Sequence, residues 1–292
     1  MQSREHIARQ LREQSNGWFT GRACHPEPEQ IQRMIEAIQW VLFPNYFQPK
    51  KQSTVIDCID KLHEVIAGQI HRAVYQRCIE KEVTPESAEF AKSKADAVIQ
   101  TLPTLQQMMY EDIVATYNGD PAATGYDEII LTYPGLLALM VYRIAHVIHE
   151  LDIPLLPRMM TEYAHRLTGI EIHPGATLGR GIMIDHGTGI VIGETAVVGD
   201  NVKIYQGVTL GALYFPRDEA GFMVRKTKRH PTVEDNVILY SNATVLGGDT
   251  VIGHDSVIGS NAWVTESVPP YSKVIYKTET VVTTKKSTSG QA

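Results

Sequence analysis

Three short motifs in the sequence carry side chains that suit acid–base or ionic chemistry. The first contains Asp185-His186, the second is Lys228-Arg229-His230-Pro231, and the third is Asn118-Gly119-Asp120-Pro121. An unperturbed histidine has a pKa of about 6.5 and accepts a proton near neutral pH, so His186 beside a carboxylate is a candidate general base. Taken alone, His186 and His230 are equally consistent with structural roles, and His173 is predicted to be structural.

Around these motifs, aliphatic residues recur every six positions. The first series is Ile172, Leu178, Ile184, Ile192, Val198, Ile204 and Leu210, with a slip of two residues after Ile184. The second is Val233, Leu239, Leu246, Ile252, Ile258 and Val264, with a slip of one residue after Leu239. Six residues suit a short strand with an inward aliphatic side chain followed by a corner, and three such faces close one coil. Hexapeptide repeats are typical of a left-handed parallel β-helix, which we predict for residues 170–270.

The candidate chemical residues stand where this period is interrupted. A two-residue slip between Ile184 and Ile192 pushes Asp185-His186 out at a corner. Residues from about 214 to 232 are too many for a corner and predict one extruded loop, which ends near Arg229-His230. Because a repeat supplies only a scaffold, we expect the function at these breaks.

Residues 1–169 are predicted to form an α-helical domain, which makes the chain an α+β protein. Apolar residues there recur at spacings of three and four, as in Leu137, Met140 and Ile144, and Thr168-Gly169 is a helix stop. His146 and His149 are predicted to lie on or beside a packed helix face.

The two ends of the solenoid need protection, because each leaves a polar backbone edge. We expect the helical domain to cover the first coil and Pro269-Pro270 to stop the last one. Residues 271–292, rich in Thr, Ser and Lys towards their end, have little apolar surface to bury and are predicted to form a tail.

Composition excludes several classes of partner. The net charge of −6 leaves no basic excess for nucleic acid. The three cysteines, Cys24, Cys58 and Cys78, lack CxxC spacing, so neither a disulfide framework nor a zinc site is indicated. No signal-type or membrane-spanning apolar run is present in the sequence, because Arg143 interrupts the most apolar segment. We therefore expect a cytoplasmic protein without a membrane or nucleic-acid partner.

The chain from about residue 115 to 270 resembles the serine O-acetyltransferases of cysteine biosynthesis, a family of hexapeptide-repeat acyltransferases. The run from Ile172 through Asp185-His186 to Ala196 is similar to the catalytic stretch of that family. Arg229-His230-Pro231 and Gly119-Asp120-Pro121-Ala122 match two further family motifs. The resemblance implies transfer of an acetyl group from acetyl-CoA directly to the hydroxyl of L-serine, with no acyl-enzyme and no metal.

The resemblance also implies a role for particular residues. His186 would be the general base, and the acidic residue at position 171 would orient its ring. Serine, or cysteine as a feedback inhibitor, would contact Asp120, Asp185, Glu194, Arg229 and His230. Acetyl-CoA would lie along the solenoid between neighbouring subunits, near Gly211 and Ala212, with Ser241 and Asn261 further along. Such a site needs neighbours, which implies a homotrimer or a hexamer made of two trimers.

The sequence departs from the family pattern in four places. Glu171 stands where the family places an aspartate, and its extra methylene must be accommodated. The loop before Arg229 is about nine residues longer than usual. The Gly-Val-Pro-Ala motif common in these acyltransferases is absent after Pro270. The chain ends in Ala292 rather than in isoleucine, so the usual complex with O-acetylserine sulfhydrylase is not expected.

Three alternatives remain open from the residues alone. The acceptor could be homoserine or a sugar rather than serine. A metal-dependent β-helix enzyme of the γ-carbonic anhydrase kind would need three converging histidines, but no close histidine pair is present among His173, His186, His230 and His254. If the solenoid were a non-catalytic scaffold, the motif residues would be ordinary surface residues. The glutamate at position 171 is the observation that most favours this alternative.

Overall fold

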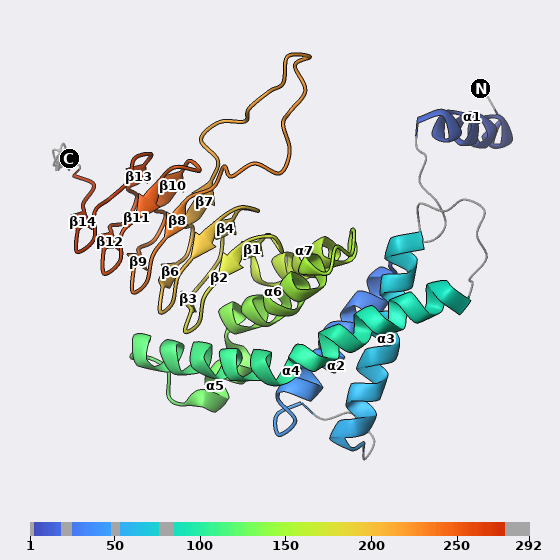
Figure 1. The fold of residues 1–292 in the computed structure, drawn as a ribbon, viewed down its shortest axis with the longest axis horizontal. Coiled ribbons are helices and arrows are strands. Elements are labelled where there is room, and N and C mark those ends of the chain that lie inside the picture. Colours follow the sequence, from blue (N-terminus) through green and yellow to red (C-terminus); the bar gives the residue numbers. More distant parts are fainter. Residues whose placement is uncertain (1–2, 19–24, 48–52, 76–84, 278–292) are drawn as a thin grey trace, which may run out of the picture.

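The computed structural model describes residues 3–18, 25–47, 53–75 and 85–277. Within these residues, seven helices precede a stack of short strands (Figure 1). The helices are α1 (Arg4–Trp18), α2 (Pro28–Leu42), α3 (Val55–Tyr75), α4 (Pro85–Gly119), α5 (Tyr126–Thr132), α6 (Pro134–Glu150) and α7 (Leu156–Thr168). The predicted helix stop is confirmed, because Gly169 caps α7 in the left-handed conformation with φ of 71°.

Among the described helices, none alone is both long and apolar enough to cross a membrane. Helices α5 and α6, which are bent by 70° relative to each other, are long and apolar enough for a membrane span only when they are counted as a pair. The apolar residues that predicted a helix here lie in the core, since most residues of α6 from Gly135 to Ile148 are buried.

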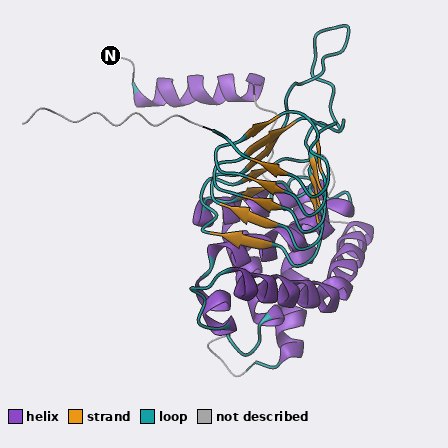
Figure 2. Cartoon of the chain, turned by 90° about the vertical axis from the view of Figure 1, so that its left-hand side faces the viewer, coloured by secondary structure: helices purple, strands orange, loops and turns teal. Residues whose placement is uncertain are grey.

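The strands are two or three residues long and form three parallel sheets, each one face of a solenoid (Figures 1 and 2). Sheet A contains β1 (Glu171–Ile172), β4 (Val191–Ile192), β7 (Thr209–Gly211), β10 (Thr244–Leu246) and β13 (Trp263–Val264). Sheet B contains β2 (Thr177–Leu178), β5 (Val197–Val198), β8 (Thr232–Val233) and β11 (Val251–Ile252). Sheet C contains β3 (Met183–Asp185), β6 (Lys203–Tyr205), β9 (Ile238–Leu239), β12 (Val257–Ile258) and β14 (Lys273–Val274).

Strand register shows where the repeat is regular and where it slips. Val191 pairs with Thr209, eighteen residues along, as three hexapeptides require. Glu171 pairs with Val191, twenty residues along, so the first coil contains the two extra residues that the sequence predicted. These residues enlarge the corner that leads from sheet C to sheet A, which we call the CA corner. The corner that leads from sheet A to sheet B is called the AB corner.

The solenoid extends further than predicted. We expected Pro269-Pro270 to stop the last coil, but β14 follows them and Lys273 and Val274 pair in parallel with Val257 and Ile258 of β12. Val268 also bridges to Ile252. The prolines fit here because they lie between strands, where no ladder hydrogen bond from their nitrogen is needed. Of the predicted tail, residues 278–292 lie outside the described part of the chain.

Two hydrophobic cores are present, and α6 contributes to both. Met140 and Ile144 pack into the core of the helical part, while Leu139 and Tyr142 pack against the aliphatic interior of the solenoid. The Tyr142 hydroxyl donates to the Ala176 carbonyl at 2.6 Å and accepts the Leu178 N–H at 3.1 Å. The helical part therefore covers the first coil, as expected, although a domain boundary at residue 169 stays a prediction.

A buried ion pair locks this junction. Arg143 on α6 donates two hydrogen bonds to Asp112 on α4, each 2.8 Å long, and both side chains are almost wholly buried. The same groups hold the solenoid, since Arg143 donates to the Gly179 carbonyl at 2.9 Å and Asp112 accepts the Ile182 N–H at 2.9 Å. Both carboxylate oxygens of Asp112, and Nε and Nη2 of Arg143, thus have a charged or backbone partner in this contact.

Replacing Asp112 by Asn should destabilise the protein strongly. The change leaves the buried Arg143 charge without its counter-ion, and breaking a buried pair on one side costs about 3–5 kcal/mol. Glu111→Gln is the matched control, because Glu111 is the next residue on α4 and pairs with Arg180 at the surface, where loss of a pair costs at most about 1 kcal/mol. Denaturant unfolding of both variants measures the difference. Equal midpoints would contradict the assigned role.

The extruded loop is an arm between β7 and β8 that projects from the AB corner (Figure 2). Arg217 and Met223 pair in antiparallel fashion near its tip, and Asp218 accepts the Phe222 N–H at 2.9 Å. The arm returns to the solenoid through Lys228, whose amino group donates to the Thr195 carbonyl at 2.7 Å. It therefore delivers Arg229 and His230 to a fixed place on the scaffold.

Candidate active site

His186 occupies the enlarged CA corner of the first coil. Its backbone is in the left-handed region with φ of 56°, which is uncommon for a residue with a side chain and marks a constrained corner. The side chain is 70% exposed, and its Nδ1 lies 3.6 Å from Oδ1 of Asp185, which ends β3. The two-residue slip thus presents an imidazole to solvent beside a carboxylate, which suits a general base.

The turn after α4 brings Asp120 to the same corner. Tyr133 donates a hydrogen bond of 2.6 Å to Asp120, and the Ala122 N–H donates to its other oxygen at 2.8 Å. These bonds, first that of Tyr133, hold the pKa of Asp120 below its usual range, and the charge of His186 acts in the same direction. The same hydrogen bond raises the pKa of Tyr133 to about 12. Asp120 is therefore a fixed, ionised carboxylate near His186.

Close packing fixes this turn against the solenoid. A Cβ atom at Gly119 would lie 2.2 Å from Sδ of Met183 in β3. Glycine at this position thus lets the helical part approach β3 closely enough for Asp120 to join the corner. Tyr205 lies beside Asp185 in the next coil and stacks on Tyr240 with ring centroids 5.2 Å apart. We call Asp120, Tyr133, Asp185, His186 and Tyr205 the CA cluster.

A second group of candidate residues lies at the AB corner. Arg229 forms an ion pair with Glu194, which follows β4. Burial by itself would raise the pKa of Glu194, but the hydrogen bond and charge of Arg229 outweigh it and place that pKa below its usual range. The Arg229 side chain remains 22% exposed in this pair, so its guanidinium keeps donors for a second anion.

His230 is mostly covered, with 7% of its surface exposed, and is predominantly neutral at physiological pH. Burial, followed by the neighbouring charge of Arg229, lowers the pKa of His230 to about 4. His173 at the same corner behaves alike, because burial and then the charge of Arg158 lower its pKa to about 4. His173 also accepts the Gly175 N–H at 3.0 Å through Nδ1, as a structural histidine would.

Glu171 belongs with this second group in one protomer. Its Oε1 accepts a hydrogen bond of 2.7 Å from Arg158 on α7, and Arg158 also pairs with Glu162 at 2.6 Å. The resemblance implied that Glu171 orients the ring of His186. Within the described residues of a single protomer, however, no hydrogen bond joins Glu171 to His186. We call Glu171, Glu194, Arg229 and His230, with the supporting Arg158 and His173, the AB cluster.

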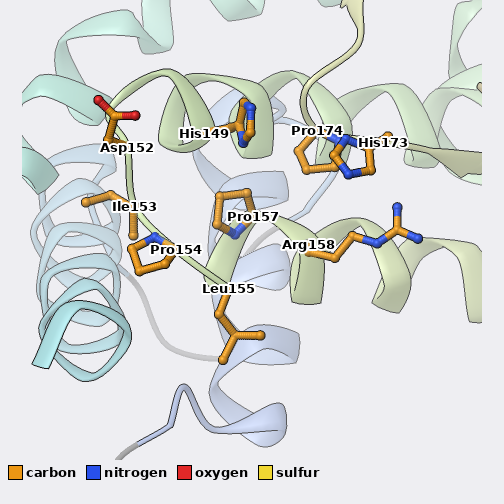
Figure 3. Close-up of a pocket in the computed structure, with 9 residues that line it drawn as sticks. All are labelled: His149, Asp152, Ile153, Pro154, Leu155, Pro157, Arg158, His173 and Pro174. Atoms are coloured by element: carbon orange, nitrogen blue, oxygen red, sulfur yellow. The ribbon is translucent and has the colours of Figure 1, made fainter. Parts of the chain in front are cut away.

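A cavity of about 290 Å³ adjoins the AB cluster (Figure 3). It lies where the α6–α7 connection meets the first coil, and it is lined by His149, Asp152, Ile153, Pro154, Leu155, Pro157, Arg158, His173 and Pro174. The rings of His149 and His173 meet edge to face with centroids 6.3 Å apart. His149 therefore lies beside the packed helix face and next to the solenoid.

The residues expected near acetyl-CoA divide between the two sides of sheet A. Gly211 ends β7, and Ala212 follows it at the AB corner. Ser241 and Asn261 lie in successive coils of the CA corner, where the Asn261 N–H donates to the Ser241 carbonyl at 3.0 Å. Within the residues that the structure describes, no group of three or more His, Cys, Asp or Glu side chains is placed to hold a metal ion.

The two clusters flank sheet A rather than meet. The CA cluster precedes the strands of sheet A, and most of the AB cluster follows them. In the described part of the chain, no hydrogen bond or ion pair connects one cluster with the other. One protomer therefore presents a base with two carboxylates on one side, and a cationic group with a neutral histidine on the other.

Sequence reasoning missed several residues that hold these clusters in place. Tyr133 fixes Asp120, Arg158 holds Glu171, and Thr195 contacts Arg229 and His230. Two of them had a local signal, because Tyr133 precedes Pro134, a residue type that favours the first turn of a helix, and Thr195 follows Glu194. Arg158 had none, since its contact with Glu171 depends on how α7 packs on β1.

No family model matches the sequence. The chain is 42% identical over 255 residues to a plasmid-encoded serine acetyltransferase of Synechococcus elongatus, covering 84% of this chain and 79% of that protein. It is 46% identical over 169 residues to serine acetyltransferase of Bacillus subtilis, covering 58% of this chain and 73% of that protein.

Solved structures of similar proteins share the fold. Entamoeba histolytica serine acetyltransferase 1 in complex with L-cysteine matches with a TM-score of 0.73 and 37% identity, over 83% of this chain and 86% of that chain. Neisseria gonorrhoeae serine acetyltransferase in complex with serine matches with a TM-score of 0.56 and 25% identity, over 84% and 95% respectively. The predicted architecture, a helical part followed by a left-handed parallel β-helix, is thereby confirmed.

Proposed function

Because this chain belongs to the serine acetyltransferase family, we propose that its active site is formed by the CA cluster of one protomer and the AB cluster of a neighbour. The protein is a serine O-acetyltransferase of cysteine biosynthesis, with acetyl-CoA as the acetyl donor. The observation that carries the assignment of the site is His186, an exposed imidazole beside Asp185 at the enlarged CA corner of the first coil.

His186 is the proposed general base. A serine hydroxyl is a poor nucleophile until its proton is removed as it attacks the thioester carbonyl, and a neutral imidazole can take that proton. The tetrahedral intermediate then expels the CoA thiolate, which receives the proton from the imidazolium. A backbone N–H near Gly211 is the proposed donor to the oxyanion. No cysteine nucleophile is needed, and Cys58 lies buried in α3 away from both clusters.

The charged groups fit the two ends of a free amino acid. Asp120 and Asp185 are carboxylates near His186 and suit the substrate ammonium group. Arg229, held by Glu194, can bind the substrate carboxylate with two parallel hydrogen bonds, and His230 can add another. In this arrangement the Cα atom lies between the two charged ends, and the hydroxyl on Cβ points to His186. L-Cysteine has the same ammonium and carboxylate groups, so we propose that it competes at this site.

The division of the site supports a trimer with three head-to-tail contacts. Placing sheet A of one protomer against the CA corner of the next would bring the two clusters together, and three such contacts close a ring. We propose that Glu171 then orients His186 of the neighbouring protomer. Acetyl-CoA would lie in the same groove, between Gly211 and Ala212 on one side and Ser241 and Asn261 on the other.

Other expectations from the sequence stay predictions. These are the pairing of trimers into hexamers, the cytoplasmic location, the absence of a metal, of a membrane and of nucleic acid as partners, and the lack of a usual complex with O-acetylserine sulfhydrylase. A division into a helical domain and a catalytic β-helix is likewise proposed.

Release of CoA from acetyl-CoA should depend on L-serine in the purified protein. A thiol reagent follows the release, with L-homoserine and simple sugars as alternative acceptors at the same concentration. We expect serine to give the highest kcat/KM, because sugars lack the ammonium and carboxylate groups that the two clusters suit. Homoserine has both groups, but its extra methylene would move the hydroxyl away from the position next to His186. Added L-cysteine should raise the KM for serine. Preference for a sugar, or hydrolysis without any acceptor, would refute the proposed site.

A further inference from the structure

Thr195 is the hub of contacts at the AB corner. Its hydroxyl oxygen accepts the backbone N–H of Arg229 at 2.9 Å and that of His230 at 3.1 Å. The same hydroxyl lies 2.9 Å from Nδ1 of His230, and its carbonyl accepts the amino group of Lys228 at 2.7 Å. One threonine therefore attaches three consecutive residues of the returning arm to the preceding coil.

The backbone of Thr195 also decides where the proton of His230 resides. The Thr195 N–H donates to Nδ1 of His230 at 3.1 Å. An N–H can only donate, so Nδ1 must be an acceptor, and a neutral ring then carries its proton on Nε2. The hydroxyl hydrogen of Thr195 can point to the same Nδ1, because both oxygen lone pairs already accept the two backbone N–H groups. Every atom around Nδ1 thus favours one tautomer.

Gly193 provides the space in which the ring lies. A Cβ atom at this position would be 2.1 Å from both Cδ2 and Nε2 of His230. The glycine is needed for this close approach, since its φ is not positive. Nε2 has no hydrogen-bond partner within the described residues and is not among the fully buried unpaired polar atoms. The Nε2–H donor therefore remains available to a ligand beside Arg229.

We propose that Thr195 is a positioning residue that fixes the tautomer and orientation of His230, so that its Nε2–H donates to the carboxylate of the amino-acid substrate beside Arg229. The inference rests on the proposed function and names the recognition role within that site. It makes His230 a hydrogen-bond donor for binding and leaves proton removal to His186. Loss of the Thr195 hydroxyl should therefore impair serine binding more than the chemical step.

The test compares Thr195→Val with Thr195→Ser. Valine keeps the shape but removes the hydroxyl, so the backbone N–H groups of Arg229 and His230 lose their acceptor, while the backbone N–H at position 195 still donates to Nδ1 of His230. We expect the KM for serine to rise by about tenfold or more, as for a lost hydrogen bond to a charged group, with a smaller change in kcat and in the KM for acetyl-CoA. Serine at position 195 keeps the hydroxyl and should remain within about threefold of the unaltered protein.

Thr177→Val is the matched control, because Thr177 is an exposed threonine in β2, the strand of sheet B that precedes β5 in the ladder. The kinetic constants of Thr177→Val should equal those of the unaltered protein. Equal KM values for Thr195→Val and Thr195→Ser would overturn the inference. So would a parallel rise of both KM values in Thr195→Val with a lowered Tm, since that result indicates a merely structural role.

Variants of His230 test the donor directly and keep the proposal falsifiable if Thr195→Val fails to fold. The side-chain amide of Gln places an N–H near the position of Nε2, whereas that of Asn lies nearer Nδ1. His230→Gln should bind serine more tightly than His230→Asn, by about threefold or more. The reverse order would overturn the assigned tautomer. The serine-dependent release of CoA by the unaltered protein is measured first, so a failure of the proposed function is recognised separately.

Discussion

Replacing His186 with alanine should lower kcat by about 10² to 10⁴, the usual loss for a missing general base. The substrate hydroxyl would then attack the thioester without a group to accept its proton, while the charged residues that bind serine remain. The KM for serine should accordingly change much less than kcat. Steady-state kinetics over a range of serine and acetyl-CoA concentrations, with the folded state checked by circular dichroism, measures both quantities.

His254→Ala is a closely matched control for this prediction. His254 is also a solenoid histidine beside a carboxylate, with Nδ1 2.8 Å from Asp255 and 41% of its side chain exposed. It lies between sheet B and sheet C, away from both clusters, so its replacement should leave the kinetics unaltered. Activity of His186→Ala within a few-fold of the unaltered protein would refute the base. Equal losses in both variants would indicate damage to the solenoid.

Much of the fold could be predicted because the hexapeptide period is a direct consequence of packing. Each inward aliphatic residue, such as Ile192, fills one level of the solenoid interior, so its absence from the expected position reveals an extra residue in the chain. The slip after Ile184 shows an enlarged coil in this way, and it places His186 at a corner. The end of the solenoid was harder to predict from the sequence, because prolines between short strands do not prevent a further strand such as β14.

The candidate site was only partly predictable for a physical reason. A sequence motif states which residues are present, but not which corner of the solenoid each one occupies. Asp185 and Glu194 are close in sequence, yet they lie on opposite sides of sheet A. The contact between Arg158 and Glu171 depends on the angle at which α7 meets β1. The several contacts of Thr195 depend on the path by which the arm returns.

A mixture of two inactive variants should recover activity if each site is shared by two protomers. His186→Ala damages only the CA cluster, and Arg229→Ala damages only the AB cluster. In a cyclic trimer that contains both kinds of protomer, one of the three sites receives an intact cluster from each side. Doubly tagged mixed trimers, purified from co-expression, should therefore show about a third of the unaltered activity. Either variant alone should lose about 10²-fold or more at low serine concentration.

The matched control pairs His186→Ala with Asp185→Ala, two changes in the same CA cluster. Every site of such a mixed trimer receives a damaged CA cluster, whichever protomer supplies it, so no activity should return. Recovery in the first mixture together with none in the second would require that the clusters of different protomers meet. Absence of recovery in both mixtures would contradict a shared site. In that case His186 would have to act together with residues of its own chain. The structure argues against this, because it places the AB cluster of the same chain on the other side of sheet A.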